Sequence, residues 1–340
     1  MNEGVKVNSD IYDRFENTPE NLLDLYGKMF RIRSFENELV KLYQDGQVYG
    51  GNHSYQGEEA IASGACHALA EGDVIFSTHR GHGHALAKGV PTAKLFAELM
   101  ARETGSNGGR GGSMHIYYKP AGFMGSNGMV GGGIGLATGA AFAFKYNKKP
   151  NVAVTFFGDG ASNMGIFYES LNLASVHKLP CIYICENNRF ATATPFKKIA
   201  ANTEVSSRGL IFRINTVTVD GNNVMDVYEA VAEARERAIK GEGPTLIECK
   251  TYRHYGHYIG DLVYGVYRTK EQMDTFKVSN DPVTRFREAL IGAYGLTEEQ
   301  VAGKEEEIRK EIADGYEFAK NSPMSDPAHV FEHLFAEEDM

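Results

Sequence analysis

The sequence has few cysteines, no long apolar run and no excess of positive charge. Four cysteines lie in apolar stretches, without the spacing of a disulfide framework, at Cys66, Cys181, Cys185 and Cys249. We expect them to be buried thiols in a reducing compartment. No apolar run approaches the roughly 20 residues that span a bilayer, so the sequence argues against an association with the membrane.

Cationic side chains are also scarce. There are 35 Lys and Arg residues against 44 Asp and Glu residues, which gives a net charge of −9 at pH 7. Nucleic-acid backbones are bound by clustered cations, so this balance argues against a nucleic-acid partner. Residues 1–17 are polar and acidic and lack the apolar core of a signal peptide, so we expect a cytoplasmic location.

Short apolar runs alternate with segments of helical periodicity along the chain. Hydrophobic residues at 42% and charged residues at 23% are ordinary for a soluble globular enzyme. The expected helices cover residues 22–43, 57–69, 91–102, 131–145, 163–178 and 224–240, and the expected strands cover residues 152–157, 181–185, 216–219 and 245–250. This alternation predicts an α/β fold with a doubly wound, mostly parallel sheet.

Domain boundaries are hard to find in this chain. We find no internal repeat and no clean linker. The sequence therefore predicts a flexible segment over residues 1–18 and a single domain over residues 19–340, helical and acidic from about residue 281. The helix over 22–43 and the C-terminal helices could present apolar faces to a partner chain.

Two polar motifs follow neighbouring predicted strands. Gly158-Asp159-Gly160 comes after the strand over 152–157, and Asn187-Asn188 comes after the strand over 181–185. The strands of such a βαβ unit end at one edge of the sheet, where open α/β sheets bind ligands. Asp159 and Asn188 could each be a helix cap or a turn residue. Together they favour Mg²⁺, which keeps further positions for water and phosphate oxygens.

Glycine-rich segments surround this predicted site. Gly160-Ala161-Ser162 opens a helix, where small residues and free N–H groups would suit a diphosphate. Residues 105–135 are rich in glycine and are expected to form a functional loop. Gly131-Gly132-Gly133-Ile134-Gly135 does not spell the dinucleotide fingerprint, and no P-loop motif occurs. Both observations weaken a nucleotide-binding interpretation.

Histidines cluster at residues 79–84 and again at His254 and His257. Zinc ligation is disfavoured, because neither cluster has helical i, i+4 spacing or cysteine partners. Hydrogen-bond donors or proton carriers near an anionic ligand are the preferred interpretation. Arg80, beside Gly81, would suit a bidentate grip on a phosphate, although a surface arginine and a structural histidine remain alternatives.

Several ordered motifs resemble a known family. They are Gly158-Asp159-Gly160 through Glu186-Asn187-Asn188-Arg189-Phe190, Gly111-Gly112-Ser113-Met114-His115, Tyr252-Arg253-His254-Tyr255-Gly256-His257 and Tyr267-Arg268-Thr269. Together they resemble the α subunit of the first component of 2-oxo acid and acetoin dehydrogenase complexes, over about residues 20–335. The resemblance implies a thiamine-diphosphate-binding fold and an enzyme that needs thiamine diphosphate and Mg²⁺.

The resemblance also implies roles for individual residues. Asp159 and Asn188 would be side-chain magnesium ligands, and Phe190 would add its carbonyl. Cofactor contacts would come from His79, Arg80, Gly128, Val130, Gly160, Ala161 and His257, and the catalytic residues near the reacting carbon would be His53 and His257. We expect the stretch 191–208, which follows Asn188, to become protease-resistant when cofactor and Mg²⁺ bind.

Partners and substrate follow from the same resemblance. A catalytic glutamate of the family comes from a β subunit, which implies an α₂β₂ heterotetramer and transfer of a two-carbon unit to a lipoyl-bearing acyltransferase. His79 and Phe190 stand where pyruvate-type subunits commonly carry Tyr, and Gly260-Asp261 resembles acetoin-type subunits. The substrate is expected to be acetoin, with pyruvate or a branched-chain 2-oxo acid as alternatives. A non-catalytic scaffold is the alternative of another class.

Overall fold

A computed structural model describes residues 14–261, 265 and 267–332. Within these residues five strands form one sheet in the order β1-β2-β3-β7-β6, and every pair is parallel. The strands are β1 (Val74–Phe76), β2 (Ala153–Gly158), β3 (Cys181–Asn187), β6 (Asn215–Asp220) and β7 (Thr245–Lys250). The predicted α/β class with a mostly parallel sheet is confirmed. A separate two-stranded ribbon joins β4 (Phe190–Ala191) to β5 (Thr194–Pro195).

Both faces of the central strands β2 and β3 are buried. In β3, Cys181, Tyr183 and Cys185 pack into one apolar cluster, while the alternate residues Ile182 and Ile184 pack into another. Parallel strands covered on both faces have continuous apolar sequences rather than alternating ones. This burial explains why the runs at 152–157 and 181–185 carry so few polar side chains.

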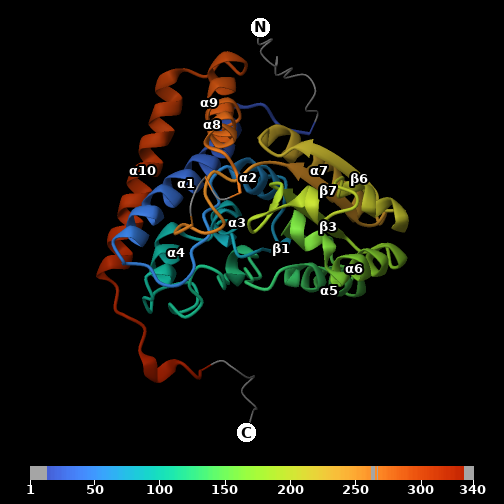
Figure 1. Cartoon of the computed structure of the whole chain (residues 1–340), viewed down its shortest axis with the longest axis horizontal. Helices are drawn as coiled ribbons and strands as arrows, with labels where there is room; N and C mark the ends of the chain where they lie inside the picture. The colour runs from blue at the N-terminus through green and yellow to red at the C-terminus, as the bar shows by residue number, and fades with distance from the viewer. Residues whose placement is uncertain (1–13, 262–264, 266, 333–340) are drawn as a thin grey trace.

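Helices cover the two faces of the sheet (Figure 1). On one face α5 (Gly132–Tyr146) packs on β1, β2 and β3 and contacts α6 (Gly165–Val176). On the other face α7 (Val224–Ile239) packs on β3, β6 and β7 and contacts α2 (Glu59–His67). The remaining helices are α1 (Pro19–Gln44), α3 (Gly81–Lys88), α4 (Thr92–Leu99), α8 (Lys270–Ser279), α9 (Pro282–Gly292) and α10 (Glu298–Asn321).

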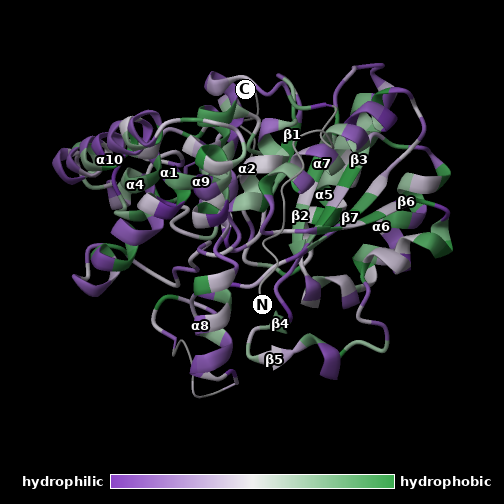
Figure 2. Cartoon of the chain, turned by 90° about the horizontal axis from the view of Figure 1, so that it is seen from above, coloured by the Kyte–Doolittle hydropathy of each residue, from purple (hydrophilic) through white to green (hydrophobic). Residues whose placement is uncertain are grey.

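The terminal helices form a layer beside the sheet, seen from above in Figure 2. Helix α10 packs against α1 and α4, and its Ile308 and Ile312 are buried in the same cluster as Phe35 of α1. These helices therefore bury their apolar faces on one another within the chain. The C-terminal helical part starts at α8, before the predicted position of about residue 281.

Strand β1 and helix α3 are not among the elements predicted from the sequence, and neither are α8 and the ribbon of β4 and β5. Strand β1 is three residues long, and α3 contains Gly81 and Gly83, residues that favour a loop. A Cβ atom on Gly83 would overlap the ring of Tyr55. The glycines of α3 thus permit close packing and are compatible with a helix.

Part of the predicted flexible N-terminal segment is packed. Phe15 is buried and lies edge-on to Tyr228 of α7, with ring centroids 4.9 Å apart. Residues 1–13 lie outside the described residues, so flexibility there stays a prediction. None of the described helices is long and apolar enough to cross a membrane.

Candidate active site

Four strands of the sheet end beside one cavity. The segments after β1, β2, β3 and β7 carry Arg80, Asp159, Asn188 and Arg253 to its wall. The cavity holds about 870 Å³, including the space at its open mouth. It lies at the carboxyl ends of the parallel strands, the position where open α/β sheets bind ligands.

Most of the predicted site residues line this cavity. They are His79, Arg80, Val130, Asp159, Gly160, Ala161, Asn188, Phe190 and His257. His53 is not part of the lining, but its ring contacts those of His79 and His257. Gly128 is not part of the lining either, although Asn127 and Met129 are.

Asp159 is buried at the end of β2 and has one unused oxygen. Its Oδ1 accepts a hydrogen bond from the backbone N–H of Gly160 at 2.7 Å. Its Oδ2 is buried without a hydrogen-bond partner. Burial raises the pKa of this carboxyl to about 6. A buried carboxylate oxygen without a partner costs free energy unless a cation or donor reaches it.

Asn188 lies opposite, at the end of β3. Its Nδ2 donates to Oε1 of Glu58 at 3.0 Å, and its Oδ1 accepts from the backbone N–H of Phe190 at 3.3 Å. Between them Arg189 has a φ of 72°, in the left-handed region. The chain therefore turns sharply after Asn188 and carries Phe190 back to the cavity wall.

Two buried guanidinium groups bring positive charge to the cavity wall. Arg80 donates to the carbonyl oxygens of Ser54 and His257, at 2.7 and 2.6 Å. Burial, followed by the repulsion from Arg253, lowers the pKa of Arg80 to about 10. Arg253 donates to the carbonyl of Thr192 and to the hydroxyl of Tyr267, and its Nε is buried without a partner. The alternative that Arg80 is a surface arginine is wrong, because its side chain is buried.

Small residues keep space open between these groups. A Cβ atom on Gly160 would lie 2.8 Å from the Cβ of Ala191, in the loop that passes over it. A Cβ atom on Gly158 would meet no atom within 4 Å. The first glycine admits the loop, and the second leaves room in the cavity wall.

Three imidazole rings meet beside the cavity. His53, His79 and His257 come from separate segments, and their ring centroids are 4.7–5.4 Å apart. Burial, followed by the charge of Arg80, lowers the pKa of His53 to about 3, of His79 to about 2 and of His257 to about 4. All three rings are therefore uncharged at neutral pH. The Nδ1 atoms of His53 and His257 are buried without partners.

His82 and His84 of the first histidine cluster have a different environment. Both are fully buried on α3. The ring nitrogens of His82 pair with Glu36 and Ser113, and those of His84 pair with Ser77 and Glu186. These two histidines are satisfied core residues, and they do not line the cavity.

Several lining residues are not singled out by the sequence. The most consequential are Arg253 and Glu186. Both residues stand in motifs that carry the family resemblance, although no role was predicted for either of them. Their place in these motifs is the signal by which they could have been found. Glu186 accepts hydrogen bonds from Tyr55 and His84 and interacts with the second buried carboxylate, Glu58. Burial, followed by the charge of Glu186, raises the pKa of Glu58 to about 8.

Comparisons with known proteins agree with this geometry. The profile of the family described as "Dehydrogenase E1 component" matches residues 27–328. The chain belongs to the dehydrogenase E1 component family. This E1 chain is 43% identical over 306 residues to the α subunit of acetoin:2,6-dichlorophenolindophenol oxidoreductase from Bacillus subtilis, covering 90% of this chain and 91% of that protein.

Other relatives of the E1 chain carry two different names. An α subunit with the same acetoin name, from Cupriavidus necator, is 41% identical over 316 residues, covering 93% of this chain and 94% of that protein. The pyruvate dehydrogenase E1 component α subunit from Rhizobium meliloti is 39% identical over 316 residues, covering 93% and 90%. The chain is therefore an E1 α subunit, an oxidoreductase component of 2-oxo acid or acetoin dehydrogenase complexes.

Membership in the E1 family implies thiamine diphosphate and Mg²⁺, and the cavity fits both. Asp159 offers a buried oxygen without a partner, as a hard cation requires. Arg80 and Arg253 supply positive charge for a diphosphate. The space at Gly158 allows a ligand to approach the backbone closely.

Proposed function

We propose that this chain is the α subunit of an acetoin dehydrogenase that depends on thiamine diphosphate and Mg²⁺. Together with a β subunit, in an α₂β₂ heterotetramer, it cleaves the carbon–carbon bond beside the carbonyl of acetoin. The two-carbon unit then passes to a lipoyl-bearing acyltransferase. A cytoplasmic location and a single domain over residues 19–340 belong to the same proposal.

The three imidazoles beside the cavity support the choice of substrate. Acetoin has a carbonyl and a hydroxyl group and no charge, so neutral donors and acceptors suffice to bind it. His53 and His257 each have a buried Nδ1 atom without a partner. A 2-oxo acid brings a carboxylate, which is bound most strongly by a cation. The two relatives with acetoin in their names, at 43% and 41% identity, support the same choice.

The residues of this chain would bind the cofactor and the metal ion. When bound, thiamine diphosphate supplies the electron sink for cleavage next to a carbonyl. Asp159 and Asn188, with the carbonyl of Phe190, would hold the Mg²⁺. Arg80 and Arg253 would neutralise the diphosphate, aided by the N–H groups of the turn at Gly160 and Ala161. Gly128 and Val130 would contact the cofactor ring through their backbone.

The histidines would orient the substrate. His53 and His257 would hold its oxygen atoms, and His79 would pack against both rings. Asp261 supports this arrangement, because its Oδ2 accepts a hydrogen bond from the backbone N–H of His257 at 2.8 Å. The loop that carries His257 is thereby tied to the Gly260-Asp261 pair.

An apolar surface beside the cavity supports a β partner. Val130 and Met129 are exposed at the cavity, and exposed apolar side chains continue over α5 and α6 at Leu136, Phe142, Met164, Ile166, Leu173 and Val176. Gly131 lies against Met164, and Gly135 lies against Ile166, so the two helices form one surface. We call these eight residues the α5–α6 surface. Extended apolar surfaces of this kind mark protein contacts.

Acetoin and pyruvate assayed side by side test the choice of substrate. The enzyme assembled with its β partner would be given each substrate with an artificial electron acceptor, and we expect a higher kcat/KM for acetoin. A branched-chain 2-oxo acid would be the third substrate. Preference for either 2-oxo acid would contradict the proposal for acetoin and leave the E1 assignment intact.

Replacement of the metal ligands tests the cofactor and the scaffold alternative. Asp159→Ala should abolish Mg²⁺-dependent binding of thiamine diphosphate, measured by calorimetry on the assembled enzyme. Asn188→Ala should remove turnover as well. Full turnover after Asn188→Ala would favour a non-catalytic scaffold.

A further inference from the structure

The carboxamide of Asn188 can bind a metal only if its oxygen is available at the cavity. An asparagine side chain presents an acceptor oxygen and a donor NH₂ group of nearly the same shape. Rotation by 180° about the last bond would exchange them and present the wrong group to a cation. The neighbours of the carboxamide must therefore determine which end is which.

Two neighbours of opposite hydrogen-bonding character do this. The backbone N–H of Phe190 can only donate, and it lies 3.3 Å from Oδ1 of Asn188. Oε1 of Glu58 lies 3.0 Å from Nδ2 of Asn188 and accepts from it. Exchange of the two ends would place a donor against the N–H of Phe190 and the carboxamide oxygen against the accepting Oε1 of Glu58. The pair of contacts therefore stabilises one orientation.

Glu58 is well placed for this role. It lies just before α2, is fully buried and comes from a segment 130 residues away from Asn188. Its neighbour Glu59 is also buried, but both of its oxygens already have partners. Oε1 pairs with Nε of Arg33 at 2.6 Å, and Oε2 accepts from the backbone N–H of Gly57 at 2.9 Å. Of these two adjacent carboxylates, Glu58 is the one in contact with a metal-ligand candidate.

We propose that Glu58 is a positioning residue for the metal site, which holds the carboxamide of Asn188 with its oxygen available to Mg²⁺. This inference rests on the proposed metal site at Asp159 and Asn188. Groups that orient metal ligands by hydrogen bonds typically change metal affinity by about 10–100-fold when removed.

Two substitutions at residue 58 separate the hydrogen bond from the charge and the volume. Glu58→Gln keeps an oxygen that can accept from Nδ2 of Asn188. Glu58→Leu keeps a similar volume and removes the acceptor. Mn²⁺ would be titrated into the assembled, metal-free enzyme with thiamine diphosphate, and free Mn²⁺ would be measured by electron paramagnetic resonance. We expect Glu58→Gln to remain within about threefold of the wild type and Glu58→Leu to bind about 10–100-fold more weakly.

A reversed pair provides a second test, which does not depend on the leucine variant folding. Asn188→Asp replaces the NH₂ group that donates to Oε1 of Glu58 by a second oxygen and should weaken Mn²⁺ binding. Adding Glu58→Gln gives the introduced carboxylate a neutral partner with an NH₂ group to donate. We expect the double variant to bind Mn²⁺ at least about tenfold more tightly than Asn188→Asp alone, since residues in contact show coupled effects.

The outcomes distinguish this inference from the function on which it rests. If Asp159→Ala and Asn188→Ala weaken Mn²⁺ binding while Glu58→Leu does not, the role of Glu58 is wrong and the metal site stands. If Glu58→Gln is as weak as Glu58→Leu, or the double variant shows no recovery, the hydrogen-bond role is also wrong. Unchanged binding in Asp159→Ala and Asn188→Ala would overturn the metal site itself.

Discussion

His79 illustrates how burial changes the chemistry of a single residue. The pKa of this imidazole falls to about 2 in the folded chain, chiefly through burial and then through the charge of Arg80. In the unfolded chain an ordinary histidine has a pKa of about 6.5. Between these values the unfolded state binds a proton that the folded state does not. His79 therefore opposes folding increasingly as the pH falls below about 6.5.

Replacement of His79 should make folding less sensitive to acid. Each such histidine changes the free energy of unfolding by about 1.4 kcal/mol per pH unit over this range. On lowering the pH from 7 to 5, we expect His79→Phe to lose about 2 kcal/mol less stability than the wild type, measured by urea denaturation at both pH values. His329→Gln, at an exposed site, should show no such reduction. An equal loss in His79→Phe and the wild type would contradict the uncharged state of His79 in the folded chain.

At the scale of an element, a single carboxylate organises the glycine-rich loop. Glu98 of α4 is fully buried, and its two oxygens accept from the backbone N–H groups of four loop residues. The distances are 2.6 Å to Asn107, 3.0 Å to Gly109, 2.6 Å to Gly111 and 3.2 Å to Gly112. The loop is therefore ordered by a charged anchor, although glycine by itself favours disorder.

Neutralising this anchor should loosen the loop. Hydrogen bonds to a charged group contribute about 1.5–3 kcal/mol each, and Glu98→Gln replaces one accepting oxygen by a donor. We expect a loss of about 2 kcal/mol in unfolding free energy, with faster amide exchange confined to residues 105–112. Glu103→Gln, on an exposed side chain nearby, is the matched control. Equal effects in the two variants would show that Glu98 does not order the loop.

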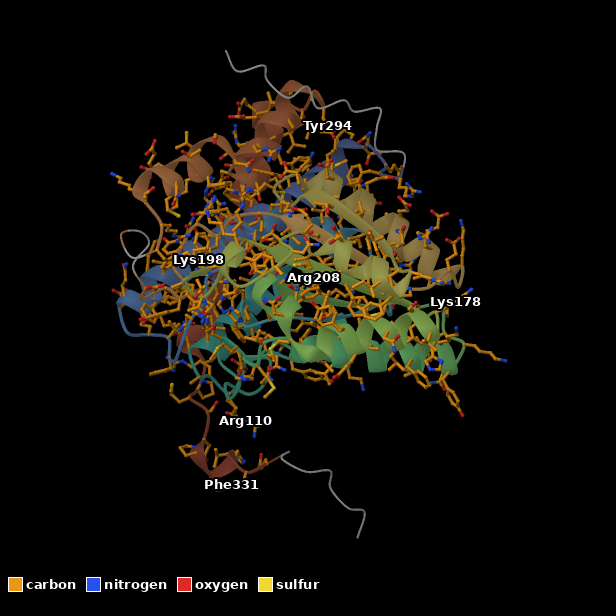
Figure 3. The ribbon with its side chains drawn as sticks, turned by 45° about the vertical axis from the view of Figure 1, so that its right-hand side comes forward. Arg110, Lys178, Lys198, Arg208, Tyr294 and Phe331 are labelled. Atoms are coloured by element: carbon orange, nitrogen blue, oxygen red, sulfur yellow. The ribbon has the colours of Figure 1, made fainter. Side chains whose placement is uncertain are left out.

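A buried arginine similarly attaches the stretch 191–208 to the turn after Asp159. Arg208 lies within the body of the molecule (Figure 3) and donates to Ser162, Asn163 and Tyr168. It also donates to the carbonyl of Asn202 at 2.9 Å. The stretch is therefore tied to the turn that follows Asp159.

Loss of Arg208 should expose this stretch to protease. We expect Arg208→Met to raise the rate of cleavage within residues 191–204 by about tenfold or more, since each lost buried hydrogen bond contributes about 1 kcal/mol. Thiamine diphosphate with Mg²⁺ should slow cleavage of the wild type and act less on Arg208→Met. Arg213→Met, at an exposed position, serves as the control. Cleavage that is unaffected by cofactor in the wild type would contradict the coupling.

At the scale of the whole molecule, the helices α5 and α6, on one side of the sheet, carry exposed apolar side chains. On the α5–α6 surface, Leu136 is 55% exposed and Val176 is 69% exposed. This surface continues to Val130 at the cavity. A partner seated there would lie next to the cavity of the proposed active site.

Charges on this surface should therefore block assembly. We expect Leu136→Asp with Val176→Asp to reduce co-purification of the β partner at least tenfold, measured by size-exclusion chromatography of the co-expressed chains. Ile239→Asp, on a 41% exposed residue at the end of α7, changes the opposite side of the sheet and should assemble normally. Normal assembly of the double variant would exclude the α5–α6 surface as the β interface.

The sequence is informative wherever the deciding signal is local. The runs that form β2 and β3 can be predicted because β-strands with both faces buried have continuous apolar sequences. Asp159 and Asn188 can be found because they follow two such runs. Strands β6 and β7 can be predicted because they continue the alternation of strands and helices. Strand β1 is too short to recognise, and α3 escapes prediction because Gly81 and Gly83 favour a loop. The two glycines of α3 make room for Ser126 and Tyr55, which are distant in the sequence.

The sequence by itself determined the four longer strands of the sheet, the family resemblance and nine of the residues that line the cavity. The tertiary structure decided which of these residues meet and in what state. It brought His53, His79 and His257 together, buried Arg80 and placed Arg253 and Glu58 beside the predicted metal ligands. Contacts between distant segments and the pKa shifts caused by burial depend on how the chain packs, and no local pattern of residues encodes them.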